Sequence, residues 1–364
     1  MTASSLARVE KQLDELKPWD AKTQALVCTG VIDEAPDVKT YLFQAEGGAW
    51  FRYRPGQFVT LELPASPETV LRTYTISSSP SRPYSMAVTV KAQAGSIGTR
   101  WMFDHLFPGV KIRAYGPAGT FTLGEKRAEK YLFISAGSGI TPGMSMLRWL
   151  ADCAPNTDVT FINSARRPEE IIFRAELELL ATRMPNLKLG FLAEMRSLSS
   201  PWSGLTGRID AQKLGLLAPD FLEREIYCCG PEPFMNAVST IARDSGFAMD
   251  GYFQESFSPT AAEVSAPVPP VEASEVASRH AVRFALSDAD GFCADGETLL
   301  QGARAAGVRI PAACESGLCG TCKVLKVSGE VEMNHNGGIL DHEVEEGYIL
   351  ACCSRPLGAV EIEA

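Results

Sequence analysis

Apolar-rich runs of strand length, separated by Gly and Pro, fill the chain between residues 23 and 124. We predict strands at ALVCTGVI, KTYLFQA, QFVTLEL, RTYTIS, SMAVTVK and VKIRAY, with breaks such as RPGQ and FPGVK between them. Many short strands with few helical stretches are typical of a barrel or a sandwich. We therefore expect an antiparallel β-barrel domain over residues 23–124.

The pattern changes after residue 124 to an alternation of strands and helices. Runs that predict strands (KYLFISA, DVTFINSA, LKLGFLA and REIYCCG) alternate with stretches that predict helices (PGMSMLRWLADC, EEIIFRAELELLA, DAQKLG and PEPFMNAVSTIARDSG). Such alternation indicates a parallel sheet with right-handed crossover connections. Residues 125–257 are therefore predicted to form an α/β parallel-sheet domain.

Two further segments differ from these domains in composition. Residues 258–278 (SPTAAEVSAPVPPVEASEVAS) are rich in Ala, Pro, Ser, Val and Glu and contain no aromatic residue, which favours a semi-extended linker. This linker separates off a third unit, residues 279–364. Residues 1–22 form an N-terminal extension, for which we expect a short amphipathic helix that packs on the body. One face of that helix would carry Leu6, Val9, Leu13 and Leu16.

Charge and apolar content argue against some classes of protein. The formal net charge is −10, and residues 279–364 hold seven Lys/Arg against thirteen Asp/Glu. This balance disfavours nucleic acid and anionic membrane surfaces as partners. No apolar run approaches the roughly 18–20 residues that a membrane span requires, and the first residues lack the apolar segment of a signal peptide. We expect a cytoplasmic protein, whose ten cysteines are not a disulfide framework.

Four cysteines near the C-terminus have the spacing of an iron–sulfur site. Cys314, Cys319 and Cys322 follow the pattern C-x4-C-x2-C, and Cys352 comes after 29 further residues. This is the plant-type 2Fe-2S pattern, in which four thiolates hold the cluster and small loop residues let backbone N–H groups approach the sulfur atoms. Structural zinc more often takes paired C-x2-C units, and only one such unit is present. Cys353 competes with Cys352 for the fourth position.

The whole of residues 279–364 resembles plant-type and oxygenase-reductase ferredoxin domains, including DGETLLQGARAAGVRIPAAC before the cysteine loop. The resemblance implies an α+β domain of the β-grasp type. It also implies that Cys352, which precedes CSRP, is the fourth ligand rather than Cys353.

A second motif, RTYTISSSP from Arg72, combines residue types that suit a flavin nucleotide. Arginine matches phosphate through its fork of donors, and tyrosine offers a flat face to an aromatic ring. On an extended strand Arg72 and Tyr74 share one face and Thr75 points to the other. The motif is weak alone, but YRPGQF precedes it, and GPAGTF and the glycine-rich turn AGSIGTRWM follow it. Such a turn at the start of a helix presents N–H groups to phosphate.

These motifs together resemble the ferredoxin–NADP reductase superfamily, in which a flavin-binding barrel precedes a nicotinamide domain. The resemblance implies that Arg72 contacts the flavin phosphate, that Tyr74 stacks on the isoalloxazine and that Thr75 hydrogen-bonds near flavin N5. FAD is expected rather than FMN, although some relatives of the phthalate dioxygenase reductase type use FMN. The other predicted cofactor-binding residues of the barrel are Thr73, Lys91, Gly98 and Thr99.

Two turns of the α/β domain are expected to bind the nicotinamide nucleotide. In ISAGSGITPGMSML a strand leads into glycines and then into a helix, where close backbone approach and the helix N-terminus favour a pyrophosphate. In YCCGPEPFM a second strand ends at a similar turn, and the superfamily resemblance implies that the two turns flank the nucleotide. The predicted residues are Gly137, Gly139, Thr141, Pro142, Cys229, Gly230 and Pro231.

Residues after the last strands complete the predicted site. Glu255 and Phe257 in YFQESF resemble the acidic and aromatic residues that the superfamily places near the flavin ring. The predicted catalytic residues are these two together with Thr75 and Cys229. Glu194 would repel a 2′-phosphate and accept from ribose hydroxyls, which favours NADH. The positive charges of Arg166 and Arg167 favour NADPH instead. Both nucleotides, NAD(P)H, therefore stay possible, and NADH is preferred.

The order of the modules predicts an electron-transfer reductase. A hydride donor, a flavin and a one-electron cluster together convert electron pairs into single electrons, with the cofactors supplying the chemistry. The whole chain resembles reductase components of Rieske-type oxygenases, particularly those that demethylate quaternary ammonium compounds such as glycine betaine. It also resembles reductases for hybrid-cluster proteins, and a redox sensor without turnover is the alternative of another class. A further hypothesis is that the linker lets the acidic cluster domain move between the flavin and the acceptor.

Overall fold

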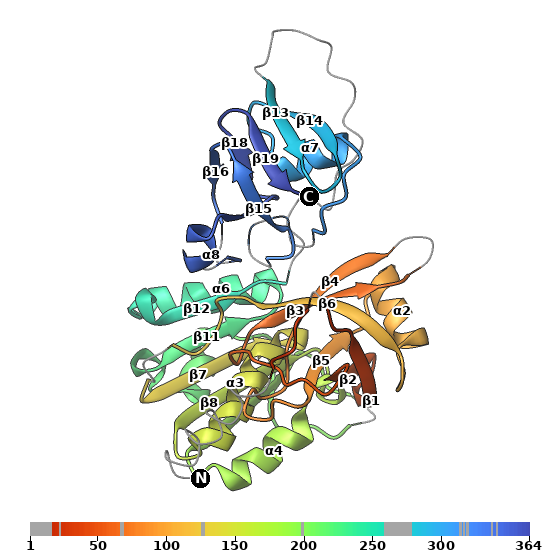
Figure 1. Ribbon diagram of the computed structural model, residues 1–364. Helices are drawn as coiled ribbons and strands as arrows, with labels where there is room; N and C mark the ends of the chain where they lie inside the picture. Colours follow the sequence, from red (N-terminus) through yellow and green to blue (C-terminus); the bar gives the residue numbers. More distant parts are fainter. Residues whose placement is uncertain are drawn as a thin grey trace.

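The computed structural model describes three domains in chain order (Figure 1). The described residues are 17–21, 23–65, 69–124, 128–197, 200–257, 279–312, 315, 317, 320–335, 338–339 and 341–364. The predicted N-terminal helix and the predicted linker lie outside them. Within this part of the chain, no helix is long and apolar enough to cross a membrane.

The first domain is an antiparallel barrel, as predicted. Its six strands pair in the order β4-β3-β6-β1-β2-β5, and a bridge between Ile76 and Val88 brings the end of β4 onto β5. The core side chains, among them Tyr41, Phe43 and Leu61, are fully buried. The elements are β1 (Leu26–Ala35), β2 (Val38–Ala45), β3 (Phe58–Leu63), β4 (Val70–Thr75), β5 (Met86–Lys91), α2 (Ile97–His105) and β6 (Lys111–Ala118).

The second domain is the predicted parallel sheet, with strand order β10-β9-β8-β7-β11-β12. Successive strands run outward from β7 in one direction and from β11 in the other, so the chain reverses its direction of winding between these two strands. Ligands of such sheets bind at this switch point, beyond the carboxyl ends of the strands. The strands are β7 (Lys130–Ala136), β8 (Asp158–Ala165), β9 (Leu187–Ala193), β10 (Leu205–Thr206), β11 (Glu225–Cys229) and β12 (Tyr252–Glu255).

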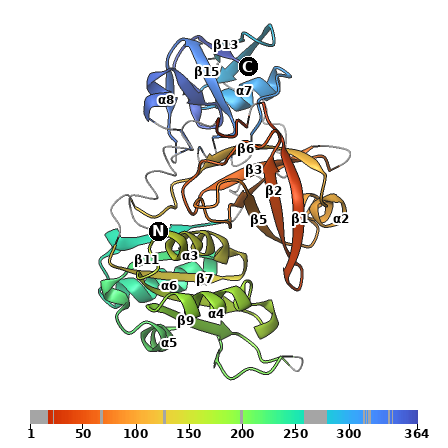
Figure 2. The same ribbon diagram turned by 60° about the horizontal axis from the view of Figure 1, so that its bottom comes forward.

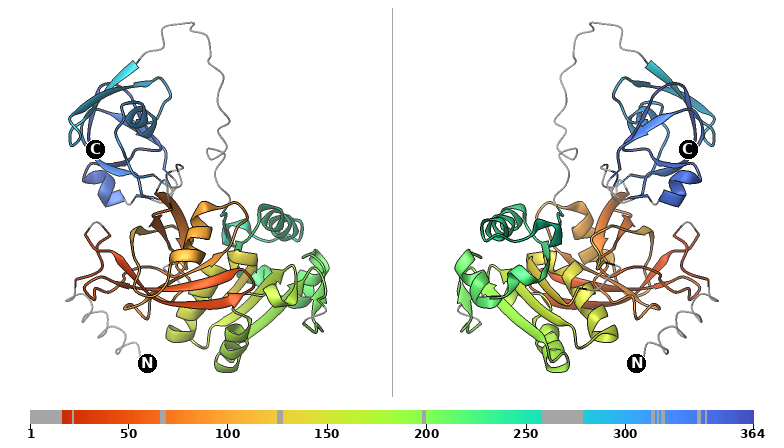
Figure 3. Two further views of the ribbon diagram at one scale, coloured as in Figure 1. Left: turned by 90° about the vertical axis from the view of Figure 1, so that its right-hand side faces the viewer. Right: turned by 90° about the vertical axis from the view of Figure 1, so that its left-hand side faces the viewer.

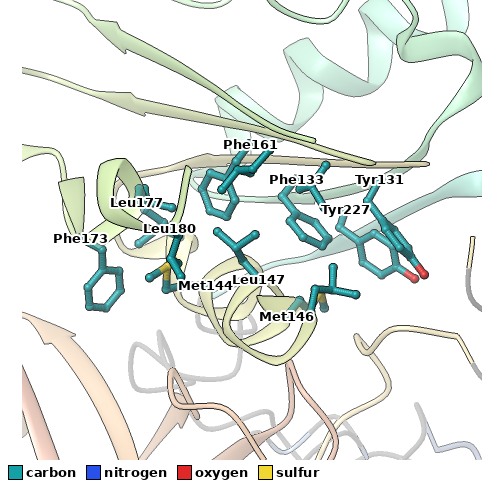
Figure 4. Packing of buried hydrophobic residues seen from close by; sticks show 14 of the residues in the cluster. Tyr131, Phe133, Met144, Met146, Leu147, Phe161, Phe173, Leu177, Leu180 and Tyr227 are labelled. Carbon is teal, nitrogen blue, oxygen red and sulfur yellow. The ribbon is translucent and has the colours of Figure 1, made fainter. Parts of the chain in front are cut away.

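Helices cover both faces of this sheet, so its strands are apolar on both sides. Tyr131 and Phe133 of β7 face α3 and α4, where they pack with Leu147 and Phe161 (Figure 4). The alternate residues of β7 belong to the other apolar cluster, with α5 and α6. The helices are α3 (Ile140–Cys153), α4 (Arg174–Arg183), α5 (Ala211–Leu217) and α6 (Glu232–Asp244); the short 3-10 turns are η1 (Gly137–Gly139), η2 (Pro168–Glu170), η3 (Phe221–Glu223) and η4 (Met249–Gly251).

The helix predicted at EEIIFRAELELLA was wrong at its start. Residues 168–170 form the separate turn η2, and α4 begins only at Arg174. Phe173 has a left-handed backbone with φ of 58°, which no helix interior tolerates. Its side chain is buried and packs against the guanidinium of Arg148 at 4.7 Å, so tertiary packing holds this conformation.

The third domain is α+β, as the ferredoxin resemblance implied. A five-stranded sheet, β14-β13-β19-β15-β17, packs on α7, whose Leu299, Leu300 and Ala303 are buried against Val282 and Phe284. Thr298 and Gln301 close a capping box that fixes the start of α7. The elements are β13 (Arg279–Phe284), β14 (Ala289–Ala294), α7 (Leu299–Ala305), β15 (Lys323–Ser328), β16 (Val331–Met333), α8 (Asp341–Glu345), β17 (Tyr348–Leu350), β18 (Ser354–Pro356) and β19 (Val360–Glu363).

The barrel contacts both other domains (Figures 2 and 3). Arg148 of α3 donates to the backbone oxygen of Ser77 at 2.6 Å, and Ser145 donates to that of Ser78 at 2.7 Å. These bonds join the α/β domain to the segment after β4. The C-terminal domain lies over β3, β4 and β6, where Thr321 donates to Thr60.

Candidate functional site

The flavin motif lies on β4 and leads into the segment that bonds to α3 of the α/β domain. Tyr74 pairs with Val59 of β3, and Thr75 pairs with Phe58. The hydroxyl oxygens of Tyr74 and Thr75 are both buried and have no partner within the described part of the chain. Buried polar atoms normally have hydrogen-bond partners, so these two fit a bound polar ring such as a flavin.

Arg72 lies beside the first turn of α2, as a phosphate site requires. A Cβ atom on Gly98 would lie 3.0 Å from Cγ of Arg72, so a larger residue there would push the arginine side chain away from the helix turn. Ser96 caps the helix by accepting from the backbone N–H of Thr99. The arrangement places a guanidinium and a helix N-terminus together, and both favour a phosphate anion. Thr73 points to the other face of β4 and is exposed.

A cavity of about 850 Å³ opens at the switch point between β7 and β11. It extends from the end of β5 in the barrel to the helix N-termini of the α/β domain. Its volume is in the range of ligand and cofactor sites. The predicted residues that line it are Lys91, Gly137, Gly139, Glu194, Gly230, Pro231 and Phe257. Thr141 and Pro142 are buried in the first turn of α3 and do not line it.

Glycines permit the two nucleotide turns to touch. A Cβ atom on Gly139 would lie 2.4 Å from the backbone oxygen of Cys229 and 2.6 Å from the nitrogen of Gly230. The first of these turns also needs a left-handed residue, which is Gly137 with φ of 54°. The N-termini of α3 and α6 therefore meet at one point of the cavity, where they can bind a pyrophosphate.

Two charged residues that the sequence interpretation missed, Glu170 and Arg208, line the cavity. Lys91 forms an ion pair with Glu170 at 3.4 Å, and Glu194 pairs with Arg208 at 3.5 Å. Arg166 lines the cavity, but Arg167 does not. Ser164 also lines it and has a buried hydroxyl without a described partner. The available signal for Ser164 was its position as a small polar residue at the carboxyl end of a strand.

Removal of the Glu194 carboxylate should relax the choice between nicotinamide nucleotides. We expect Glu194→Gln to raise the ratio of kcat/KM for NADPH to that for NADH about tenfold, or roughly 1.4 kcal/mol. The substitution removes a charge that repels a 2′-phosphate and leaves Arg208 and Arg166 to attract one. Steady-state kinetics with both nucleotides measures the ratio. Glu178→Gln, on the exposed side of α4, is the control and should leave it unchanged; an unchanged ratio in Glu194→Gln would contradict the prediction.

Glu255 and Cys229 are adjacent across the last two strands of the sheet. They are paired residues of β11 and β12, and the Glu255 Oε2 atom is buried without a described partner. Burial raises the pKa of Glu255 to about 8. The pKa of the Cys229 thiol is raised well above its usual value by burial and then by the charge of Glu255. At neutral pH both groups therefore hold their protons, and Glu255 can donate one.

The raised pKa of Glu255 gives stability a specific pH dependence. The folded protein keeps this proton up to about pH 8, whereas an unfolded chain releases it near pH 4.5. Between these pH values the folded state binds more protons than the unfolded state. The contribution of Glu255 to the free energy of unfolding therefore falls as pH rises from 4.5 to 8, by at most about 1.4 kcal/mol per pH unit. Thermal unfolding of flavin-free protein should show Glu255→Gln gaining stability relative to wild type as pH rises. A difference in midpoint that does not change with pH would refute the assignment.

Two of the four predicted cluster ligands lie in the described part of the chain. Cys322 and Cys352 are buried, and the backbone N–H of Cys352 donates to Sγ of Cys322 at 3.4 Å. Hydrogen bonds from Cys322, from Cys353 and from the backbone of Gly317 lower the pKa of Cys352. N–H groups directed at sulfur suit thiolates that hold a cluster. Cys314 and Cys319 lie outside the described residues.

Two glycines of the cysteine loop, and the contacts of Cys353, also fit a cluster held by Cys322 and Cys352. Gly317 and Gly320 have φ of 71° and 69°, and a Cβ atom on Gly320 would lie 2.6 Å from the backbone oxygen of Gly338. The thiol of Cys353 donates to the backbone oxygen of Leu350 at 3.6 Å. Its neighbour Cys352 is the residue whose backbone contacts Cys322, which supports Cys352 as the fourth ligand.

Comparison with known families matches each domain separately. Residues 28–123 match the model described as an oxidoreductase FAD-binding domain, and residues 133–240 match the oxidoreductase NAD-binding domain. Residues 290–357 match the 2Fe-2S iron-sulfur cluster binding domain. The cofactors are therefore FAD, NADH and a 2Fe-2S cluster.

Several characterised proteins are similar over nearly the whole chain. A stachydrine N-demethylase reductase subunit from Rhizobium meliloti is 50% identical, covering 97% of this chain and 99% of the relative. A glycine betaine monooxygenase reductase subunit from Pseudomonas aeruginosa is 46% identical, covering 95% and 96%. An NADH oxidoreductase from Escherichia coli is 32% identical, covering 90% and 94%.

Solved structures show the same fold at lower identity. Phthalate dioxygenase reductase aligns with a TM-score of 0.56 and 22% identity, over 94% of this chain and 98% of that chain. An intact type IV self-sufficient cytochrome P450 monooxygenase aligns with a TM-score of 0.65 and 23% identity, over 94% of this chain and 41% of that chain. The chain therefore has the three-domain fold of phthalate dioxygenase reductase.

Proposed function

The chain belongs to the family of monooxygenase reductase subunits that join FAD-binding, NAD-binding and 2Fe-2S domains, and we propose that its acceptor is a Rieske-type oxygenase that demethylates a quaternary ammonium compound. Within the family, electrons pass from NADH through FAD and the cluster to the oxygenase. The choice of a quaternary ammonium demethylase as the acceptor rests on sequence identity. Identity is 43–50% to reductase subunits for stachydrine and glycine betaine, but 30–32% to reductases with other functions.

The bound cofactors supply hydride acceptance and single-electron transfer, and the protein supplies position and proton control. We assign the turns at Gly137–Gly139 and Gly230–Pro231 to the pyrophosphate of NADH, since their helix N-termini meet in the cavity. Arg72 and the first turn of α2 are assigned to the phosphates of FAD. Tyr74 and Thr75 are assigned to its ring system, because their hydroxyl groups are buried without described partners.

Glu255 and Phe257 are assigned to the place where nicotinamide and flavin meet. Glu255 holds a proton at neutral pH because its carboxyl group is buried. Phe257 lines the cavity and is 44% exposed, so its ring can cover the site or yield to a nucleotide. We also propose a cytoplasmic location, which suits Cys28, Cys228 and Cys293 as buried thiols without disulfides.

Reconstitution with oxygenase components tests the acceptor. The holoprotein is combined with the purified oxygenase subunit of a stachydrine or glycine betaine system, NADH and oxygen. We expect formaldehyde to form in proportion to NADH consumed, and only when both proteins and the quaternary ammonium substrate are present. If NADH reduces ferricyanide normally but formaldehyde forms with neither system, the proposed substrate class is wrong while the reductase assignment stands.

A further inference from the structure

The boundary between the cluster domain and the barrel contains a hydrogen bond between two threonines. Thr321 Oγ1 donates to Thr60 Oγ1 at 3.3 Å, and the two residues are 8% and 1% exposed. Thr321 immediately precedes Cys322 in the cluster loop, whereas Thr60 is at the centre of β3. Figure 1 shows the C-terminal domain standing over this part of the barrel. The contact therefore joins the cluster loop directly to the barrel sheet.

The hydrogen bond continues across the sheet to the flavin strand. Thr60 Oγ1 lies 3.0 Å from Thr73 Oγ1, and the two residues are direct partners of β3 and β4. Paired residues of neighbouring strands present their side chains on one face, so the hydroxyl groups form a row. Thr73 lies between Arg72 and Tyr74. The row thus begins at Thr321, next to the predicted cluster ligand Cys322. It ends at Thr73, next to the predicted flavin contacts Arg72 and Tyr74.

A second residue of the barrel sheet, beside Thr60, also lies close to the cluster domain. Tyr115 of β6 is the other strand partner of Thr60, and its hydroxyl donates to Glu62 at 2.7 Å. Burial, followed by this bond to Glu62, raises the pKa of Tyr115 to about 12, and the positive charges of Arg113 and then of Arg309 oppose the rise. Arg309 belongs to the cluster domain, so this domain brings a positive charge close to Tyr115, the strand neighbour of Thr60.

We propose that the hydroxyl row Thr321–Thr60–Thr73 sets the docked position of the cluster loop on the flavin strands. Thr60 and Thr321 are then positioning residues for transfer of one electron from flavin to cluster. A buried hydroxyl left without its partner is costly, whereas in the undocked state both hydroxyl groups bind water. Loss of one hydroxyl therefore weakens the docked state specifically. The inference rests on the family assignment and not on the identity of the acceptor.

Thr60→Val in the holoprotein tests the proposal, because valine keeps the shape and removes the hydroxyl. In stopped-flow mixing with NADH, flavin reduction should keep its wild-type rate, while cluster reduction slows roughly three- to tenfold. Amide hydrogen exchange gives a readout independent of turnover. Exchange should become faster over residues 58–63 and 70–75, which the docked domain covers.

Thr40→Val is the matched control. Thr40 and Thr89 form a buried hydroxyl pair at 2.7 Å in the same barrel, away from the cluster domain. This variant removes the same chemical group and should leave cluster reduction and exchange at the boundary unchanged. Equal slowing in Thr60→Val and Thr40→Val would assign the effect to general destabilisation of the barrel and overturn the proposal.

The double variant Thr60→Val/Thr321→Val tests whether the two hydroxyl groups act through each other. If they do, the double variant slows cluster reduction no further than the larger single effect. Effects that multiply would show that the groups act independently and would refute the docking role. Cluster content is checked by visible absorbance in each variant. If Thr321→Val binds no cluster, amide hydrogen exchange in Thr60→Val still tests the docking role. Unchanged exchange over residues 58–63 and 70–75 in that variant would overturn the proposal.

Discussion

Replacement of Cys322 by serine is expected to remove the cluster and with it all one-electron output to the oxygenase. A 2Fe-2S site of this type needs four thiolates, and Cys322 is one of the two predicted ligands that lie together in the described residues. The visible absorbance and the electron paramagnetic resonance signal of the reduced cluster should both be lost. NADH-dependent reduction of ferricyanide, which needs the flavin and not the cluster, should persist.

Cys353→Ser provides the comparison that makes this result specific. Cys353 is adjacent to Cys352, but its thiol donates to the backbone oxygen of Leu350. The variant should keep its cluster and most of its output, because a serine hydroxyl can donate to the same oxygen. Loss of the cluster in Cys353→Ser with retention in Cys352→Ser would reverse the assignment of the fourth ligand.

Replacement of Gly139 by alanine should abolish productive binding of NADH. The added Cβ atom would lie 2.4 Å from the backbone oxygen of Cys229, and a backbone atom cannot rotate away as a side chain can. The turns after β7 and β11 must therefore separate, and a displacement of this size at a positioning site costs on the order of 100-fold in rate. We expect kcat/KM for NADH to fall by about that factor in ferricyanide reduction.

Gly215→Ala is the matched control for this substitution. Gly215 lies in α5, and no atom lies within 4 Å of the position that its Cβ would take. Alanine is also the better helix former, so the variant should be as stable as wild type or slightly more stable. If Gly139→Ala and Gly215→Ala both retained full activity with NADH, the two turns would not form the nucleotide site.

Patterns of short range were sufficient to predict the barrel and the parallel-sheet domain, whereas the type of the third domain came from its resemblance to ferredoxin domains. The alternation of strands and helices after residue 124 reflects a repeating local unit, and the punctuation of the barrel by Gly and Pro reflects local turn chemistry. The cysteine spacing is likewise local, because a tight loop must bring its thiolates to one cluster. Each of these features depends on residues near one another in the chain, which is why the sequence displays them.

The start of α4 shows where local patterns fail. The run EEIIFRAELELLA contains residues that favour a helix, yet Phe173 adopts a left-handed backbone and the helix begins one residue later. Its buried ring packs on Arg148, which lies on another helix. Tertiary packing here outweighs helix propensity, which contributes only tenths of a kcal/mol per residue.

The sequence by itself determined the barrel, the parallel sheet and the iron–sulfur spacing, because periodicity and spacing are local properties of the chain, and the resemblance of its motifs to a known superfamily added the flavin, the nicotinamide nucleotide and the β-grasp domain. Only the tertiary structure decided that Glu255 is buried enough to hold its proton, that Arg208 pairs with Glu194, and that Thr321 contacts Thr60. The physical reason is distance along the chain. Thr321 and Thr60 are separated by 261 positions, and their contact depends on how the surfaces of two domains pack, which no local pattern records.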